Sequence, residues 1–264
     1  HRDLHSFPTR RSSDLCGQVL TANTRTKEHV WPRWLQKRFG LEKRQFHGIH
    51  SGIPWGISTL STRTQRGGSL VLGGVCAICN NGWMSELETK VAPLFEKLWE
   101  PNNDRYVIFD LESCETLSHW AFKTSLVINL ASNYRKIIPL EHYREFFEYR
   151  QFPKNTTIDI SLASFKNNLQ WMQGQSAAIF TEGDMPQHLA KEVSSLYVIT
   201  LDIGGILLKT ARFPTEFFEA SLPNSGNVKR IWPYVIPAKL SLHNRKNEMG
   251  KFQNRTLFRI KKIT

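Results

Sequence analysis

The sequence predicts an α+β fold, in which helices and antiparallel strands occupy separate stretches around a hydrophobic core. Some stretches repeat apolar residues every three or four positions, as helices do, and others alternate apolar with polar residues, as strands do. Hydrophobic residues make up 40% of the 264-residue chain, which allows a sizeable core at this length. No apolar run reaches the ~18 residues of a membrane helix, so we expect no membrane partner.

The first hundred residues contain a short knuckle and strand expected at 16–21, a second expected strand and one expected helix. Residues 69–76, SLVLGGVC, are rich in β-prone side chains, and the pair Gly73-Gly74 predicts a bulge in that strand. Residues 80–99 repeat apolar side chains at helical spacing, and Pro93 is expected to kink or end the regular part of this helix. Residues 40–68 have the Gly, Ser, Thr, Arg and His content of a loop.

Residues 103–238 are expected to form an α+β domain with antiparallel strands. Their periodicity predicts two helices, followed by strands that include a hairpin turning at Gly204-Gly205. The expected helices are 116–132 and 140–150, and the expected strands are 156–165, 176–181 and the two halves of 196–213. Residues 239–264 are expected to be a basic C-terminal segment.

The net charge of +12 is concentrated in two parts of the chain. Residues 16–70 hold nine Lys and Arg against two Glu, and residues 239–264 hold eight against one. Such an uneven distribution is expected where a protein meets a polyanion, whereas charges that only solvate loops would be more scattered. The charge pattern therefore favours nucleic acid as the partner, with an acidic protein as the alternative.

The cysteine pattern indicates a structural zinc site. Four cysteines are too few for a disulfide scaffold and fit a reducing compartment, so we expect a cytoplasmic protein. Cys76 and Cys79 form a Cys-x-x-Cys pair, and Cys16 belongs to an earlier loop. Four thiolates from two such pairs would hold zinc tetrahedrally and tie this loop to a strand–helix junction. Cys114 lies outside the pattern and is expected in the core.

The residue three positions before Cys16 is Ser13, where a second Cys-x-x-Cys pair would have a cysteine. Residues 5–15, HSFPTRRSSDL, resemble the translation of a common sequencing-library adapter. Residues 1–15 are therefore taken as non-native and left out of the fold prediction. We infer that the native chain has a cysteine at position 13. With three of four thiolates, weakened zinc retention is expected.

The segments KEHVWPRWL and VCAICNNGWMSELE together resemble the HNH nuclease superfamily, and in particular its zinc-stapled members. The resemblance covers residues 13–99 and implies a ββα-metal finger stapled by zinc, so that 16–100 would be an HNH-like nuclease domain. His29 matches the general base that takes a proton from the attacking water. Glu28 and Asn80 match two ligands of a catalytic divalent cation, Mg²⁺ or another.

General chemistry agrees with these implied roles. An imidazole titrates near neutral pH without help, as a base for phosphodiester hydrolysis requires. A carboxylate and an amide suit a hard ion such as Mg²⁺, whereas thiolates suit zinc, so the two metals are not expected to compete. The helix N-terminus at Asn80-Asn81 adds backbone amides that can face a phosphate.

Other polar and aromatic residues near the motif have more ordinary expected roles. The basic residues that surround the implied site are the expected phosphate contacts, namely Lys27, Arg33, Lys37 and Arg38. His47 and His50 could bind a metal by residue type, but histidines in a loop usually bind nothing. Indole rings near the motif are expected in the core rather than as base-stacking platforms, namely Trp31, Trp34, Trp83 and Trp99.

The sequence therefore predicts a metal-dependent HNH-type endonuclease that hydrolyses nucleic-acid phosphodiester bonds, with DNA as the expected substrate. The middle Asn of the HNH motif has no clear match, because the second strand begins Gly68-Ser69-Leu70. This departure supports the alternative, a zinc-stabilised nucleic-acid-binding protein whose catalytic centre has decayed.

Overall fold

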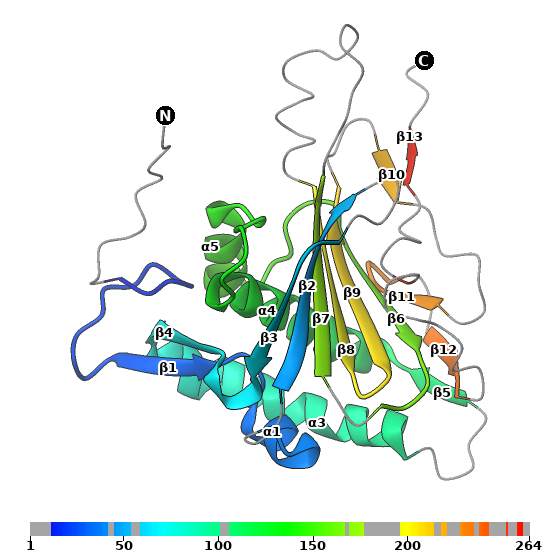
Figure 1. Cartoon of the computed structure of the whole chain (residues 1–264), viewed down its shortest axis with the longest axis horizontal. Helices are drawn as coiled ribbons and strands as arrows, with labels where there is room; N and C mark the ends of the chain where they lie inside the picture. The colour runs from blue at the N-terminus through cyan, green and yellow to red at the C-terminus, as the bar shows by residue number, and fades with distance from the viewer. Residues whose placement is uncertain are drawn as a thin grey trace, which may run out of the picture.

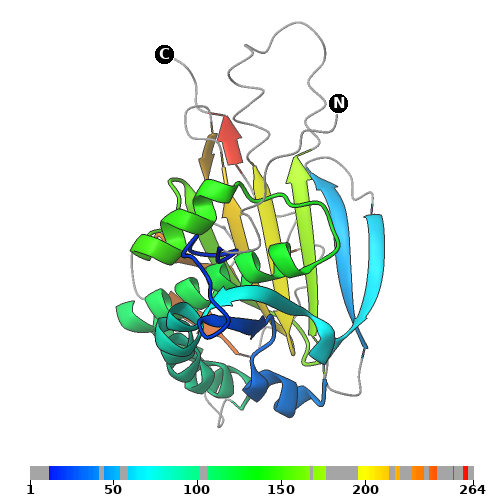
Figure 2. The same cartoon turned by 90° about the vertical axis from the view of Figure 1, so that its left-hand side faces the viewer.

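A seven-stranded sheet forms the largest part of the structure, and helices cover one of its faces (Figure 1, Figure 2). Within the described residues the fold is α+β, as predicted, and nearly all strand pairs are antiparallel. The computed structural model describes residues 12–41, 45–53, 59–100, 106–166, 169–176, 196–213, 218–220, 228–234, 238–242, 252 and 258–260.

The elements have the following bounds. The helices are α1 (Arg33–Phe39), α2 (Ala77–Cys79), α3 (Ser85–Trp99), α4 (Leu111–Ala131) and α5 (Leu140–Tyr149), with the short turns η1 (Gly67–Ser69) and η2 (Asn80–Met84). The strands are β1 (Arg25–His29), β2 (Gln45–Ile53), β3 (Thr59–Arg66), β4 (Val71–Cys76), β5 (Tyr106–Phe109), β6 (Thr156–Leu162), β7 (Leu169–Ser176), β8 (Tyr197–Ile203), β9 (Ile206–Arg212), β10 (Phe218–Ala220), β11 (Val228–Trp232), β12 (Ala238–Ser241) and β13 (Phe258–Ile260).

The strands of the large sheet lie in the order β11-β6-β9-β8-β7-β2-β3. All neighbours pair antiparallel except β2 and β7, which are parallel. The central hairpin β8–β9 turns at Gly204-Gly205, as predicted. Both glycines have positive φ values, 61° and 89°, which residues with a Cβ rarely adopt.

Helix α4 is central to the fold because it is buried along most of its length and on most of its circumference. Asp110 caps its N-terminus by accepting a hydrogen bond from Ser113 N at 2.8 Å. One side of α4 packs on the large sheet, where Ser125 Oγ donates to Thr210 Oγ1 at 3.2 Å. Its other side packs on α3 and β4. Helix α4 therefore lies between the large sheet and the small sheet formed by β1 and β4 (Figure 2).

Strands β1 and β4 form a separate antiparallel pair, and the helical turns leading to α3 follow β4 directly. The register shifts between Thr26 and Glu28, where Gly73-Gly74 of β4 oppose the single residue Lys27. This is the predicted bulge. Asp14 N donates to Gly74 O at 2.8 Å, and a Cβ on Gly74 would lie 2.4 Å from the Asp14 carboxylate. A larger residue at position 74 would require the Asp14 side chain to move, because the N-terminal turn packs directly on the bulge.

Strands β2 and β3 occupy most of residues 40–68, where the composition predicts a loop. They form one edge of the large sheet. Most of the polar residues that suggested a loop lie on β3, the last strand of the sheet. Gly48 suits β2, since a Cβ there would lie 2.8 Å from the Trp171 ring. Strands from both 16–100 and 103–238 share this sheet, so the fold joins the two predicted domains.

The three long helices lie where the periodicity predicts them, with one difference inside the first, whereas the short helix α1 has no counterpart among the predicted elements. The strand expected at 16–21 is wrong, because within it only Val19 forms a bridge, to Ser12. Helices α4 and α5 cover the predicted ranges 116–132 and 140–150. Helix α3 continues through Pro93 to Trp99, and the departure from helical geometry occurs instead at Gly82, with φ −93° and ψ −119°. A proline costs about 3 kcal/mol inside a helix, and burial of the apolar residues in the last two turns of α3 offsets this cost.

Residues 12–15 belong to the folded core, although their resemblance to an adapter argued for leaving them out. Ser13 and Leu15 are each 1% exposed. Only Ser176 of the expected strand 176–181 lies within the described residues, as the end of β7. The basic segment 239–264 is described at 239–242, 252 and 258–260. No helix in the described ranges combines the length and apolar content needed to cross a membrane.

Acid pH is expected to destabilise the fold through His142. This ring is 6% exposed and is hydrogen bonded to the Tyr197 hydroxyl at 3.2 Å. Burial lowers its pKa from 6.5 to about 4, with nearby Arg212 acting in the same direction. The unfolded chain therefore takes up a proton near pH 6.5 and the folded chain only near pH 4. The contribution of His142 to stability is complete above pH 6.5 and is lost as the pH falls toward 4.

Urea denaturation at a series of pH values measures this effect. We expect the unfolding free energy to fall by ~3 kcal/mol between neutral pH and pH 4 on account of this residue. His142→Asn should flatten the curve in that interval. An equally steep curve in the variant would show that other groups are responsible.

Candidate functional site

Three thiols from separate parts of the chain come together at the start of the helical segment. Cys16 lies in the N-terminal turn, Cys76 ends β4 and Cys79 ends α2. Their Sγ atoms all lie within 4.8 Å of one another, and those of Cys16 and Cys76 are 3.5 Å apart. Thiolates at 2.3 Å from a tetrahedral zinc ion are about 3.8 Å apart. The three cysteines could therefore hold a metal ion.

Backbone geometry explains why these thiols converge. Cys76 Sγ accepts a hydrogen bond from Cys79 N at 3.3 Å and so caps the helical turn that follows it. The preceding knuckle turns at Gly17, whose φ is 72° and whose N donates to Ser13 O at 3.0 Å. Such turns bring the first and fourth residues of a Cys-x-x-Cys unit together. Ser13 therefore holds the position that a fourth thiol would occupy.

The thiols differ in their electrostatic environment. Burial raises the pKa of Cys79 to about 12, and the neighbouring Cys76 acts in the same direction. Burial also raises the pKa of Cys16, but hydrogen bonds from Ser13 and the backbone at Gln18 outweigh it, so the pKa of this thiol is lowered. The Cys16 thiol therefore ionises more readily than the Cys79 thiol. Cys114 is buried elsewhere in the core, as predicted.

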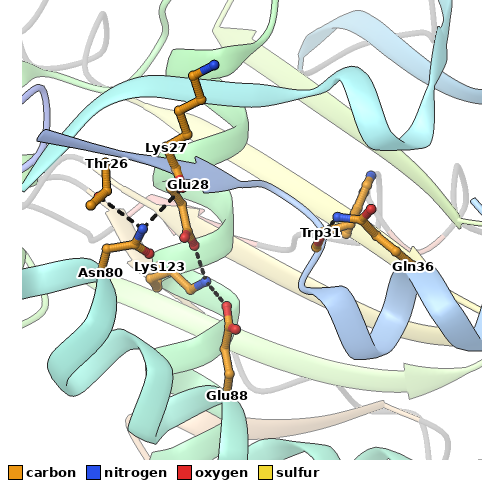
Figure 3. Close-up of polar contacts among 8 residues, drawn as sticks. All are labelled: Thr26, Lys27, Glu28, Trp31, Gln36, Asn80, Glu88 and Lys123. Carbon is orange, nitrogen blue, oxygen red and sulfur yellow. Dashed lines mark hydrogen bonds and ion pairs between the residues drawn. The ribbon is translucent and has the colours of Figure 1, made fainter. Parts of the chain in front are cut away.

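Glu28, one residue before His29 on β1, is held in a buried ion pair. Lys123 Nζ of α4 lies 3.0 Å from Glu28 Oε1 and 2.8 Å from Glu88 Oε1 of α3 (Figure 3). The side chain of Lys123 is 0% exposed, that of Glu28 8% and that of Glu88 22%. We call these three residues the buried charge cluster. It links the small sheet, α3 and α4.

Charges within the cluster stabilise one another. Burial opposes the charge on Lys123, but the Glu28 and Glu88 carboxylates outweigh it and raise the pKa of this ammonium group. Burial raises the pKa of Glu28, Lys123 partly offsets this effect, and the neighbouring Glu88 carboxylate raises the pKa further. The cluster contains two carboxylates and one ammonium group. Its formal charge is therefore −1 when all three groups are ionised.

Asn80 ties the first helical turn to strand β1. Its Nδ2 donates to Thr26 Oγ1 at 3.0 Å and to Lys27 O at 3.1 Å. The side chains of Asn80 and Glu28 lie on the same side of β1, whereas Lys27 points to the other side (Figure 3). Among the described residues, neither Asn80 Oδ1 nor Glu28 Oε2 has a hydrogen-bond partner. Asn80 therefore lies beside strand β1, on the side of the strand that Glu28 faces.

His29 ends β1 and is half-buried. Side chains alternate along a strand, so His29 is directed to the face opposite Glu28. Its Nδ1 is buried and has no hydrogen-bond partner within the described part of the chain. No residue of this part therefore orients the ring as the middle Asn of the HNH motif would.

A divalent cation at Glu28 and Asn80 fits the chemistry of these residues. A carboxylate and an amide oxygen are hard ligands, and Mg²⁺ commonly takes one or two protein ligands and completes its shell with water and phosphate oxygens. The pairing of Glu28 Oε1 with Lys123 leaves Oε2 available to an ion. Ligating carboxylates are usually held by such a hydrogen bond through their other oxygen.

The predicted phosphate contacts differ in whether their charge is already paired with a carboxylate of the protein. Lys27, Arg33 and Lys37 are exposed. Arg38 donates to Glu96 at 2.6 Å and to Glu100 at 2.9 Å. Its guanidinium also lies over the Trp99 ring. The first three residues are therefore available to a polyanion, whereas Arg38 holds α1 against α3.

The other histidines and the indole rings have structural roles. His47 and His50 lie on strand β2 rather than in a loop. His50 is buried and its Nδ1 is hydrogen bonded to Gln173 Nε2 at 2.8 Å. The four tryptophans expected in the core are buried or packed against it, namely Trp31, Trp34, Trp83 and Trp99.

Lys123 pairs with both Glu28 and Glu88, and the sequence resemblance assigns no role to Lys123 or Glu88. Lys123 is the only Asp, Glu, Lys or Arg between residues 116 and 131 of this buried helix, which is a sign of a buried partner because an unpaired buried charge is costly. Glu88 also lines a cleft of about 650 Å³ between α1 and α3. The cleft is lined by Trp34, Ser85, Glu88, Thr89, Ala92, Pro93 and Glu96. Glu88 therefore connects the buried charge cluster to the surface.

Comparison with protein-family models, curated proteins and solved structures returns no match. The functional proposal therefore depends on the residues and geometry described above.

Metal binding is expected to depend on the three clustered thiols. The visible absorption of added Co²⁺, a spectroscopic substitute for Zn²⁺, should show thiolate coordination in the purified chain and lose it in Cys76→Ser. Cys114→Ser is the matched control and should leave the spectrum unchanged. Ser13→Cys supplies a fourth thiolate and should tighten binding by about tenfold or more. Equal spectra for the wild type and Cys76→Ser would rule out this metal site.

Proposed function

We propose that this protein is an HNH-type endonuclease that hydrolyses phosphodiester bonds, with DNA as its substrate. The observation that carries the proposal is the contact between Asn80 and strand β1, which supports placing the first helical turn beside Glu28. Strand β1, strand β4 and the helix that follows β4 also have the chain order of a ββα unit.

A structural zinc ion at the thiol cluster is part of the proposal. Cys16, Cys76 and Cys79 would hold it, and the knuckle at Ser13 has the geometry for a fourth ligand. This ion would fasten the N-terminal turn to the end of β4. That attachment matters for the site because Asn80 follows Cys79 directly in the chain.

The remaining residues have distinct roles in the proposed reaction. His29 takes a proton from the water that attacks phosphorus. Glu28 and Asn80 hold a divalent cation such as Mg²⁺, which supplies Lewis acidity to the scissile phosphate and the departing oxygen. Lys27 and Lys37 are exposed and would contact phosphates of the bound nucleic acid.

A second candidate is a nucleic-acid-binding protein with the same zinc staple and no cleavage activity. Two observations on His29 favour it: strand alternation directs the ring to the face opposite Glu28, and its Nδ1 has no partner within the described residues. A general base must lie within reach of the attacking water beside the cation-bound phosphate. This candidate retains the thiol cluster and the exposed basic residues. The two candidates differ only in chemistry at His29.

A nicking assay on supercoiled DNA with Mg²⁺ or Mn²⁺ separates the two candidates. We expect His29→Ala to reduce cleavage by 10²-fold or more, a loss typical of a general base, while DNA binding persists. His47→Ala is the matched control, since His47 is exposed on β2, and should cleave like the wild type. Absence of cleavage by the wild type, with binding retained, would establish the second candidate.

The salt dependence of DNA affinity tests the proposed phosphate contacts. Lys37→Ala should lower the slope of log K against log salt by about 0.9, because each neutralised phosphate releases counterions. Arg38→Ala should change the slope much less, since Arg38 is paired with Glu96 and Glu100. Equal changes in the two variants, measured by fluorescence anisotropy, would contradict this assignment.

A further inference from the structure

The buried charge cluster contains two carboxylates but only one ammonium group, so one negative charge is not balanced within it. Lys123 and Glu28 alone would form a neutral buried pair, which is the usual arrangement for ionised groups inside a protein. Glu88 adds a second carboxylate at 2.8 Å from the same ammonium group. The cluster thus has an excess negative charge beside the free oxygen of Glu28.

Glu88 and Glu28 share the ammonium group of Lys123. Lys123 Nζ is closer to Glu88 Oε1, at 2.8 Å, than to Glu28 Oε1, at 3.0 Å. An ammonium held by Glu28 alone would cancel the charge of that carboxylate and repel a divalent cation. With Glu88 present, the positive charge is divided between two partners, and Glu28 keeps part of its attraction for a cation.

Glu88 is well placed to exert this effect without contacting the ion. It lies on α3, two turns beyond Asn80, and its side chain is 22% exposed where it lines the cleft between α1 and α3. Glu28 and Lys123 are almost completely buried. Glu88 is therefore the member of the cluster that is least needed for packing.

We infer that Glu88 is a positioning residue for the divalent-cation site: it engages Lys123 so that Glu28 keeps an oxygen and enough negative charge to bind the ion. This inference rests on the proposed function, since it assigns the ion to Glu28 and Asn80. It adds a residue outside the HNH motif to the machinery of the site.

A purely structural role for Glu88 would have a different signature. If the carboxylate only joins α3 to α4, its loss would lower the unfolding free energy and leave the affinity of a folded site for cations unchanged. The inferred role requires the affinity to fall in a chain that remains folded. Cation affinity and thermal stability must therefore be measured on the same variants.

The experiment measures Mn²⁺ binding to the full-length chain by the electron paramagnetic resonance signal of free Mn²⁺. Glu28→Gln identifies the site and should abolish it. Glu88→Gln should weaken binding by about tenfold or more, because the ion loses the attraction of a unit charge a few ångströms away. Glu86→Gln removes the same charge from an exposed position on α3 and should change affinity less than about twofold.

Glu88→Asp provides a test that retains the charge, and circular dichroism checks that each variant is folded. Its affinity should stay within about threefold of the wild type. A Glu28-dependent site with equal affinity in Glu88→Gln, or a loss in Glu88→Asp as large as in Glu88→Gln, would overturn the positioning role and leave the proposed function intact. No Glu28-dependent Mn²⁺ site in the wild type would overturn both.

Discussion

The ammonium group of Lys123, buried between two carboxylates, sets the arrangement of the layers on one side of the fold. Removing one partner from a buried ion pair typically costs 3–5 kcal/mol, because the remaining charge is left in a poorly solvated place. Strand β1 and helix α3 must therefore lie where Glu28 and Glu88 reach this single atom. The constraint fixes the small sheet and α3 on α4, and with them the position of the site.

Polar contacts on the opposite side of α4 fix the helix on the large sheet. Ser125 bonds to Thr210 on β9, and Asn129 Nδ2 donates to Gln173 Oε1 on β7 at 3.2 Å. Buried polar groups specify one arrangement, since a shifted register would leave them without partners. Contacts on two opposite sides therefore fix the position of helix α4. Residues of the small sheet, including Glu28, are thereby held at a defined position relative to the large sheet.

The parts of this fold that could be predicted from sequence are those with local signals. The apolar repeat of 116–132, the glycine pair at the β8–β9 turn and the Cys-x-x-Cys spacing each depend on residues close together in the chain. Strand β2 has no such signal, because its parallel partner β7 lies more than a hundred residues later. The same holds for Lys123, whose role depends on Glu28, 95 residues earlier. In the proposed site, the sequence resemblance points to Glu28 and Asn80, but only the fold reveals the charges around Glu28.

The insertion of β2 and β3 between β1 and β4 has a consequence for the order in which the protein is made. During synthesis, β2 emerges well before β7, so one of its edges stays unpaired until more than a hundred further residues have been added. Such delayed pairing slows folding and exposes strand edges to other chains. The N-terminal half therefore cannot complete its fold before β7 has been synthesised. Until then, we expect the nascent chain to depend on chaperones.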